Sequence, residues 1–366
     1  MPIYMDVHII PGVKARDVAK AHHLDLLHQD EYQCKCMTYW TDEQRESIFC
    51  LIEAPNKEAV EEMHNKAHGL IPHKIIEVKT TLVESFLGRI YDPNDGDTTE
   101  EGFKIIAEPS FRILLVTNIT DPALLANKLG AEKATELLGM HNDMIRKNLK
   151  QYGGSEVEHG GTGFVISFAS ATAAVSCALA IMNAMKLVAD GHFDFKIGVH
   201  GGEPIEKSNS LFGDTLQVAE NISDIAGNFK IAVTSIVKDL VVKDHFQNGN
   251  DNFFTLPVQD EELLQLLHTT LQKNWQDAAF DIPDYCKAMG MSNSQLYRKT
   301  ISLTGVSPNI FLKDFRLEKA KGLMKKKRYS ISQITFETGF SSPSYFTKCF
   351  KKKYGLLPMA YLDLLH

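Results

Sequence analysis

The last hundred residues contain one local pattern twice, and this repetition restricts the fold more than any other feature of the chain. In each copy an apolar helical segment is followed by a glycine, and then by a helical segment that begins with small hydroxyl residues and carries Arg or Lys. The copies span residues 284–299 and 331–353, and the chain turns at Gly290 and at Gly339. Two helices joined by a tight turn present the second helix to the major groove of duplex DNA. We therefore predict an all-α domain over residues 259–366, with tandem helix-turn-helix units and double-stranded DNA as its partner.

The charge of the chain is distributed unevenly. Residues 282–366 contain 15 Lys and Arg but 5 Asp and Glu, whereas residues 1–281 contain 24 and 41 of these residues. A cationic domain attracts a polyanion, and an acidic body does not bind DNA without regard to sequence. The basic runs at 325–328 and 351–353 could also be ordinary solvated faces. Their position inside or beside the two helix-turn-helix units favours contact with DNA.

Length and composition restrict the class of protein. A chain of 366 residues, 44% hydrophobic and 23% charged, is typical of globular proteins with two or three domains. We find no apolar run long enough to span a bilayer and no signal peptide, and we expect no membrane partner. The six cysteines are scattered rather than arranged as a disulfide framework, which favours a reducing compartment. We therefore expect a cytoplasmic protein.

The order of the predicted elements indicates the fold class, a multidomain α+β protein. The first 80 residues alternate as strand, helix, strand, strand, helix and strand, which predicts a ferredoxin-like α/β sandwich over residues 1–90. The second of these helices is expected to begin after a capping Asn56. The polar, turn-rich segment 91–105 is predicted to be a linker. Residues 106–258 are predicted to form a second α/β domain, in which 122–152 is one long amphipathic helical region.

Histidine is concentrated in the first domain, whose first 73 residues contain seven of the 14 histidines of the chain. His64 and His68 are four positions apart in a predicted helix, so both rings project from one face and can bind one ion. Cys34, Cys36 and Cys50 lie on neighbouring predicted strands. Imidazole and thiolate ligands suit nickel, zinc or copper better than magnesium or calcium. The alternative is that these are ordinary core or surface residues that bind no metal.

Residues 4–78 resemble a family of small ferredoxin-like proteins, one branch of which is described as nickel-binding. The matching segments include Met5-Asp6…His8, Ala21-His22…Asp25, Phe49-Cys50-Leu51 and His64…Ala67-His68-Gly69. The hypothesis is that a transition metal or small ligand is bound by the four histidines of these segments, with one cysteine or aspartate: His8, His22, His64 and His68, with Cys50 or Asp25. The remaining candidates do not clearly follow the family pattern: His23, His28, His73, Cys34 and Cys36.

Residues 261–365 resemble the AraC/XylS family of transcription regulators. The matching motifs include Gln295-Leu-Tyr-Arg298, Leu303-Thr-Gly305-Val-Ser-Pro308, Gly339-Phe340 and Ser344-Tyr-Phe346. Leu296, Phe346 and Phe350 should pack inward, and a helix over 309–325 should hold the units about 34 Å apart, one turn of DNA. The residues expected to face base edges or phosphates are Asn293, Ser294, Tyr297 and Arg298 of the first unit, and Ser342, Ser344, Thr347, Lys348 and Lys351 of the second.

Residues 111–241 resemble the catalytic domain of class III nucleotidyl cyclases, in segments such as Gly160-Gly-Thr-Gly-Phe164. That family holds two divalent ions with two carboxylates, and uses an asparagine and an arginine to orient the nucleotide. The four corresponding positions here are Asn118, Thr162, Gln217 and Asn221. The carboxylates and the cation are replaced, so no catalytic magnesium is expected. Two roles stay open for this domain: a module for dimerisation and signal transmission, or a pocket for a small molecule such as a nucleotide.

These expectations describe a non-enzymatic regulator of transcription, in which a metal or small ligand in the N-terminal or middle domain controls DNA binding. A homodimer is expected, and RNA polymerase is a further candidate partner. One alternative is an enzyme, namely a nucleotidyl cyclase or a metal-dependent catalyst fused to a DNA-binding tail. Another alternative is a scaffold whose first two domains only oligomerise. Cyclic product from ATP or GTP, and thermal shifts induced by ligands, would distinguish these three classes.

Overall fold

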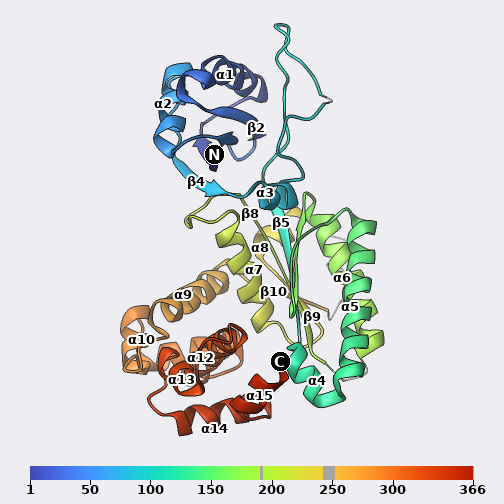
Figure 1. Ribbon diagram of the computed structural model, residues 1–366, viewed down its shortest axis with the longest axis vertical. Coiled ribbons are helices and arrows are strands. Elements are labelled where there is room, and N and C mark those ends of the chain that lie inside the picture. The colour runs from blue at the N-terminus through green and yellow to red at the C-terminus, as the bar shows by residue number, and fades with distance from the viewer. Residues whose placement is uncertain (95, 190–192, 242–251, 366) are drawn as a thin grey trace.

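Three bodies of secondary structure follow one another along the chain in the computed structural model (Figure 1). The structure describes residues 1–94, 96–189, 193–241 and 252–365. The N-terminal domain stands above the middle domain in Figure 1, and the helical C-terminal domain lies beside and below the middle sheet. Two α/β domains followed by an all-helical domain confirm the predicted multidomain α+β fold class.

The first domain has the predicted order of strands and helices. Its four strands form a sheet in the order β2-β3-β1-β4, with all neighbours antiparallel, which confirms the ferredoxin-like sandwich. The Asn56 side chain accepts a hydrogen bond from Ala59 N at 2.8 Å and caps α2 as expected. The elements are β1 (Ile3–Ile9), α1 (Ala15–His28), the 3-10 helix η1 (Gln29–Tyr32), β2 (Lys35–Asp42), β3 (Ser47–Glu53), α2 (Lys57–Ala67) and β4 (Lys74–Val78).

The two faces of this sheet have different neighbours, because successive side chains of a strand point to opposite faces. Tyr4 of β1 is buried in a cluster with Val18 of α1 and Val60 of α2. Met5, the next residue, belongs to a second buried cluster that extends to Phe212 of the middle domain. The helices therefore cover one face of the sheet, and the middle domain covers the other. Helix α3 (Thr80–Leu87), which the sequence patterns did not indicate, lies at this boundary.

The segment 91–105 connects the first two domains, but it also packs back onto the first one. The His23 ring stacks on Phe103 with 4.2 Å between centroids. The Tyr39 hydroxyl donates a hydrogen bond to the Lys104 carbonyl oxygen at 2.9 Å. The segment is therefore a strap across α1 and β2 as well as a connection.

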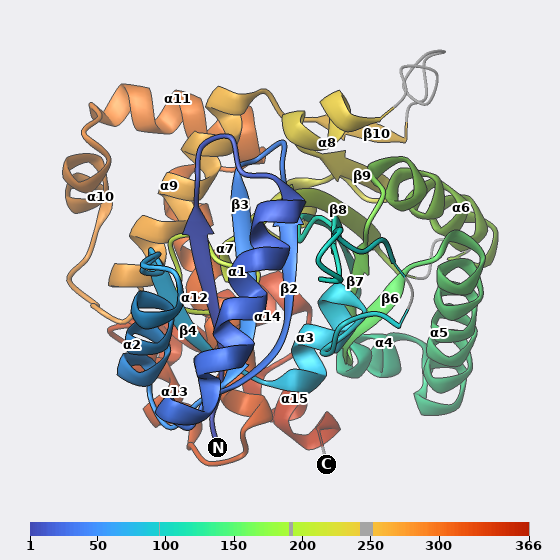
Figure 2. The same ribbon diagram turned by 90° about the horizontal axis from the view of Figure 1, so that it is seen from above.

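The middle domain is built on a six-stranded sheet with the order β10-β9-β8-β5-β7-β6. Helices α5 and α6 cover one face of this sheet, and α7 covers the other (Figures 1 and 2). The elements are β5 (Arg112–Ile119), α4 (Pro122–Leu129), α5 (Ala131–Tyr152), β6 (Ser155–Gly160), β7 (Gly163–Phe168), α6 (Ala171–Ala189), β8 (Phe195–Gly202), α7 (Gly213–Ile225), β9 (Lys230–Val233), α8 (Ser235–Leu240) and β10 (Phe253–Thr255).

Two expectations for this domain need correction. The single helical region predicted over 122–152 is two helices, because Gly130 between them has φ +87°, which a helix cannot accommodate. The expectation that no apolar run is long enough to span a bilayer is also wrong. Ala171–Val188 is long and apolar enough by length and composition alone, with a mean hydropathy of 1.6. In the structure this helix, α6, supplies Val175, Ile181 and other residues to the core beside the sheet.

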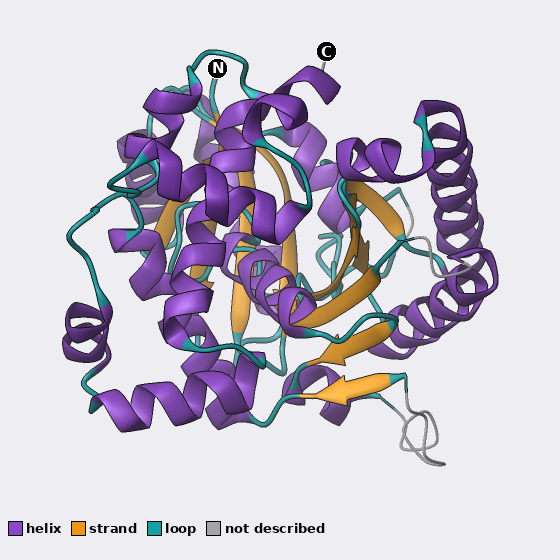
Figure 3. Ribbon diagram, turned by 90° about the horizontal axis from the view of Figure 1, so that it is seen from below, coloured by secondary structure: helices purple, strands orange, loops and turns teal. Residues whose placement is uncertain are grey.

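In its described residues, up to 365, the C-terminal domain contains helices and connecting loops and no strand (Figure 3). Its two helix-turn-helix units are α10–α11 and α13–α14, joined by α12, as the sequence predicted. Capping boxes begin α11 at Ser292 and α13 at Ser330. The turn glycines Gly290 and Gly339 have φ +63° and +72°. The helices are α9 (Val258–Asn274), α10 (Ile282–Met289), α11 (Asn293–Thr304), α12 (Pro308–Lys325), α13 (Ile331–Glu337), α14 (Pro343–Tyr354) and α15 (Pro358–Leu364).

Candidate metal centre and nucleic-acid interface

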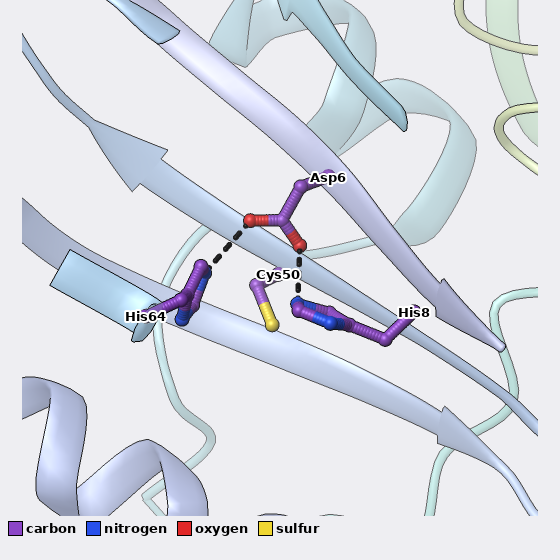
Figure 4. Close-up of side chains that lie close together, drawn as sticks. All are labelled: Asp6, His8, Cys50 and His64. Carbon is purple, nitrogen blue, oxygen red and sulfur yellow. Dashed lines mark hydrogen bonds and ion pairs between the residues drawn. The ribbon is translucent and has the colours of Figure 1, made fainter. Parts of the chain in front are cut away.

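Four buried side chains with metal-binding atoms converge between the N-terminal sheet and α2 (Figure 4). Asp6 and His8 come from β1, Cys50 from β3 and His64 from α2. Asp6 and Cys50 are direct neighbours in the antiparallel register, and alternation places His8 on the same face as Asp6. One ligand atom from each of the four lies within 4.8 Å of the others. We call these residues the Asp6 cluster.

His64 connects this group to a second one. Its Nε2 atom lies 3.0 Å from Asp6 Oδ2, while its Nδ1 atom lies 3.0 Å from Asp25 Oδ1 and 3.1 Å from His68 Nε2. His68 Nε2 is in turn 3.1 Å from Asp25 Oδ1. Asp25, His64 and His68 therefore form a second set of converging ligand atoms, which we call the Asp25 cluster.

The charges of these groups are set by their burial and by one another. Burial alone would lower the pKa of His64, but Asp6 and Asp25 outweigh burial and raise it to about 10. Burial raises the pKa of Asp6, yet His64 and His8 hold it below its usual value. Burial, together with Asp6 and Asp25, raises the pKa of the Cys50 thiol well above its usual value. His64 is thus charged and Cys50 protonated at neutral pH, so a metal ion that binds here releases protons.

A cavity of about 20 Å³ lies beside the two clusters, large enough for one water molecule or one ion. Six of the lining residues carry ligand atoms: His8, His22, Asp25, Cys50, His64 and His68. Val18, Ile48 and Leu70 contribute apolar wall to the same cavity.

The structure groups four of the five histidines and cysteines in the hypothesised ligand set. His8, Cys50 and His64 meet in the Asp6 cluster, and His68 joins His64 in the Asp25 cluster. His22 lines the cavity, but its Nε2 lies 3.6 Å from Asp92 Oδ2 and it belongs to neither cluster. Asp6 was not among the predicted ligands, although its position two residues before His8 on one strand places both on one face.

The donor set of the Asp6 cluster fits a transition metal. It offers two imidazoles, one thiol and one carboxylate, a combination that nickel, zinc or copper accepts and that magnesium or calcium does not favour. Asp25 stands behind His64 on the side away from Asp6, and a carboxylate that holds the second nitrogen of a ligating histidine orients the ring. The residues present can therefore hold such an ion.

Helix α11, the second helix of the first helix-turn-helix unit and here called its reading helix, presents the predicted polar face. Leu296 of α11 is fully buried in a cluster with Leu264 and Tyr285. The four predicted contact residues on the same helix are exposed, namely Asn293, Ser294, Tyr297 and Arg298.

The second reading helix, α14, divides its residues in the same way. Phe346 and Phe350 are fully buried, as expected. Ser342 caps the helix, since its Oγ accepts a hydrogen bond from Tyr345 N at 3.4 Å. Tyr345 is 53% exposed beside the predicted contacts and was not among them. Of the other predicted contacts Thr347 is half-buried, and three are exposed: Ser344, Lys348 and Lys351.

The four middle-domain positions that differ from the cyclase pattern make local and interdomain contacts. Asn118 Nδ2 donates to Asp224 Oδ1 at 3.3 Å, and Gln217 Nε2 donates to Asn221 Oδ1 at 3.0 Å. Asn221 Nδ2 donates to Gln265 Oε1 on α9 at 3.0 Å. The backbone oxygen of Thr162 accepts from Ile119 N at 2.8 Å. Two of these side chains thus belong to a hydrogen-bonded chain that leads into the C-terminal domain.

Two family models match parts of this chain. Residues 285–363 match a helix-turn-helix domain. Residues 4–78 match the family described as nickel responsive protein SCO4226-like. Both matches confirm the resemblances drawn from the residues of these two domains.

Similar proteins share only parts of the chain. HTH-type transcriptional regulator MtrA from Neisseria gonorrhoeae is 33% identical over 133 residues, which cover 36% of this chain and 44% of that protein. Histidine kinase P4 from Formosa agariphila is 31% identical over 137 residues, which cover 36% of this chain and 10% of that protein. This chain therefore spans less than half the length of these curated relatives. The adenylyl cyclase CyaB from P. aeruginosa is similar in structure, with 19% identity, a TM-score of 0.32, and 37% of this chain and 81% of that chain covered.

Proposed function

We propose that this protein is a cytoplasmic transcription regulator that binds a specific duplex DNA sequence, and that a transition metal in its N-terminal domain controls the binding. The observation that carries the proposal is the pair of helices α11 and α14. Each helix buries an apolar stripe and exposes polar and basic side chains at its N-terminal half, the part that enters a major groove. The match of residues 285–363 to a helix-turn-helix domain supports the same function.

The Asp6 cluster supports control by a metal ion. Its four ligand atoms come from two strands and a helix, so an ion bound there would fix the position of α2 on the sheet. Nickel is the first candidate because residues 4–78 match a nickel-responsive family, and zinc and copper suit the same donors. The proposed control is a shift between two arrangements of the DNA-binding domain, one of which the bound ion favours.

Selection of duplexes from a random DNA pool tests the proposed DNA binding. We expect enrichment of a sequence with two contacted segments about 10 base pairs apart, because the two units should enter successive major grooves. The selection is run with and without NiCl₂, ZnSO₄ or CuSO₄. Failure to enrich any duplex over scrambled competitor DNA under all of these conditions would refute the proposal.

Elemental analysis of protein purified without a histidine tag tests the proposed metal. We expect stoichiometric transition metal in the wild type and its loss in His64→Ala/His68→Ala. The matched control is His23→Ala/His28→Ala, which removes two histidines of the same domain that lie outside both clusters. Absence of metal from the wild type after incubation with nickel, zinc and copper would contradict this part of the proposal.

The proposal also includes a homodimer that contacts RNA polymerase and catalyses no nucleotide cyclisation. Amide or hydroxyl side chains at Asn118, Thr162, Gln217 and Asn221 support the absence of cyclase chemistry, which needs charged ligands for its metal ions. Incubation with ATP or GTP and Mn²⁺ should yield no cyclic product. Sedimentation of the full chain would measure its oligomeric state.

A further inference from the structure

We infer that helix α7 transmits the state of the metal centre to the first helix-turn-helix unit. The inference rests on the proposed function, since it names the route by which the proposed metal would control DNA binding. The structure provides a contact at the N-terminal end of α7 with the N-terminal domain, and a contact at its C-terminal end with the C-terminal domain. A helix of 13 residues joins points about 20 Å apart.

The strands that carry the Asp6 cluster are also the strands that contact the middle domain. Asp6 and His8 alternate on β1 with Met5 and Val7, which are buried in the cluster shared with the middle domain. Cys50 lies on β3 between Phe49 and Leu51, which belong to the same shared cluster. A shift of the metal-binding residues therefore also displaces the buried residues that alternate with them, because both groups belong to the same strands.

The loop 203–212 of the middle domain contacts the N-terminal sheet. Lys74 Nζ of β4 donates hydrogen bonds to the carbonyl oxygens of Glu206, Lys207 and Ser208 at 3.0, 2.8 and 2.5 Å. The Ser47 hydroxyl of β3 donates to Glu203 Oε1 at 2.6 Å. The N-terminal sheet therefore holds this loop from two of its strands.

The same loop is bonded to the first turn of α7. Ser208 N donates to Asp214 Oδ2 at 2.7 Å, and the Thr215 hydroxyl donates to Glu206 Oε1 at 3.3 Å. Phe212, directly before the helix, has φ +53°, a left-handed conformation that is unfavourable for a residue with a bulky side chain. Its ring packs on Phe86 of α3 with 4.7 Å between centroids. Strain of this kind persists only where surrounding contacts impose it, here the domain boundary itself.

Helix α7 is tightly packed along its length. A Cβ atom at Gly198 of β8 would lie 2.1 Å from the Ala219 carbonyl oxygen of α7, and one at Gly202 would lie 2.2 Å from Thr215 Oγ1. The α7 backbone therefore rests directly on the β8 backbone at Gly198, and the Thr215 side chain of α7 fills the space over Gly202. Little side-chain repacking is available there to absorb a displacement of its first turn, so the displacement reaches the other end.

The far end of α7 contacts the helices that hold the first reading helix. Ile222 is fully buried in one cluster with Leu264 and Leu267 of α9. Asn221 donates to Gln265 on α9, and the Leu267 carbonyl oxygen of α9 accepts from the Tyr285 hydroxyl of α10 at 3.1 Å. Helix α10 is the first helix of the first helix-turn-helix unit, so the contacts are continuous from β1 to that unit.

Hydrogen–deuterium exchange of the full-length protein with and without NiCl₂ tests this route. In the wild type, Ni²⁺ should slow exchange in α2 and should also change exchange in α7 and in α9–α10. Lys74→Met should keep the effect in α2 and lose it in α7 and α9–α10, whereas Lys74→Arg, which can still donate to the carbonyl oxygens, should restore it. Gln265→Ala should keep the effects in α2 and α7 and reduce the one in α9–α10. The control variants are Lys79→Met and Gln272→Ala, which change exposed residues near the same sites and should behave like the wild type.

The outcomes separate the route from the proposed function. If Ni²⁺ changes exchange only in the N-terminal domain, or if α9–α10 respond undiminished in both Lys74→Met and Gln265→Ala, the route through α7 is overturned while the metal site stands. If elemental analysis finds no bound nickel and α2 does not respond, the metal site and the route both fall. With a duplex obtained by selection, Ni²⁺ should change the wild-type dissociation constant about 5-fold or more, and Lys74→Met should lose most of that change.

Discussion

The Tyr361 hydroxyl of α15 donates a hydrogen bond to Asp121 Oδ2 at 3.0 Å, although the two residues are 240 positions apart in the chain. Asp121 caps α4 of the middle domain through its other oxygen, which accepts from Ala123 N at 3.1 Å. Lys325 Nζ lies 3.0 Å from Asp121 Oδ2 as well. One buried carboxylate therefore holds the second helix-turn-helix unit against the middle domain. The first unit is held separately through α7 and α9.

Tyr361→Phe should lower the free energy of unfolding of the C-terminal domain by about 1–3 kcal/mol, because it removes a buried hydrogen bond to a charged group. Thermal unfolding measures the change. Tyr329→Phe is the control, since Tyr329 is 40% exposed. In a double-mutant cycle with Asp121→Asn we expect a coupling of about 0.5–3 kcal/mol, and additive effects would contradict the contact.

The two turn glycines should respond differently to substitution by alanine. Both have positive φ, so each substitution should cost about 1 kcal/mol or more in backbone strain. At Gly339 a Cβ atom would also lie 2.3 Å from the Trp275 carbonyl oxygen, whereas at Gly290 nothing lies within 4 Å. Gly339→Ala should therefore lower the melting temperature more than Gly290→Ala. Equal effects would show that the backbone around Trp275 yields easily.

Arg298→Ala should weaken binding to a selected duplex by about 1–3 kcal/mol if the guanidinium reads a guanine. Fluorescence anisotropy with the selected duplex and with random duplex DNA measures the loss. Lys147→Ala is the control, because it removes one exposed charge from α5, on the far side of the middle sheet (Figure 1). Equal losses on both duplexes would identify Arg298 as a phosphate contact instead.

His268 should make stability depend on pH between about 4 and 6.5. Burial lowers the pKa of this histidine to about 4, and among the described residues its Nε2 atom has no hydrogen-bond partner. The unfolded chain binds a proton below pH 6.5 that the folded protein does not, so stability falls as pH is lowered through this window. The loss at pH 4 should be about 1–3 kcal/mol. His268→Leu should flatten this part of the curve, and an unchanged slope would contradict the assignment.

Asp6→Asn should weaken nickel binding about 10-fold or more, because the residue either binds the ion or orients His64 and His8. Isothermal titration with NiCl₂ measures the affinity. The control is Asp17→Asn, which removes an exposed carboxylate from α1 of the same domain. An unchanged affinity in Asp6→Asn would place the ion in the Asp25 cluster.

Local patterns were sufficient to predict much of the fold. Alternation on β1 and β3, the Asn56 cap and the glycines of the helix-turn-helix units each act within a few residues, so one sequence reveals them. Gly130 divides the helix that was predicted over 122–152. The sequence did not indicate this break, because the hydrophobic periodicity continues across Gly130. Helix α3 was missed because its residues are buried by the middle domain, and that environment lies outside the local sequence.

The candidate site was harder to predict than the fold. The spacing of His64 and His68 pointed to the site, and the two-residue spacing of Asp6 and His8 on one strand was a further signal. The pairing of Asp6 with Cys50 is known only from the register of β1 and β3. The strap that brings Asp92 to His22 was expected to be a simple linker. Contacts such as that of Tyr361 with Asp121 depend on how the domains pack together, and the local patterns of a single sequence do not indicate this packing.

The position of Trp40, Phe49 and Leu51 against a neighbouring domain has a practical consequence. In a fragment that stops near residue 90, these aromatic and aliphatic side chains would be exposed to water, and α3 would cover them only in part. Such a fragment should self-associate or precipitate, whatever its affinity for metal. Biophysical measurements on the N-terminal domain should therefore use longer fragments that retain residues 106–241.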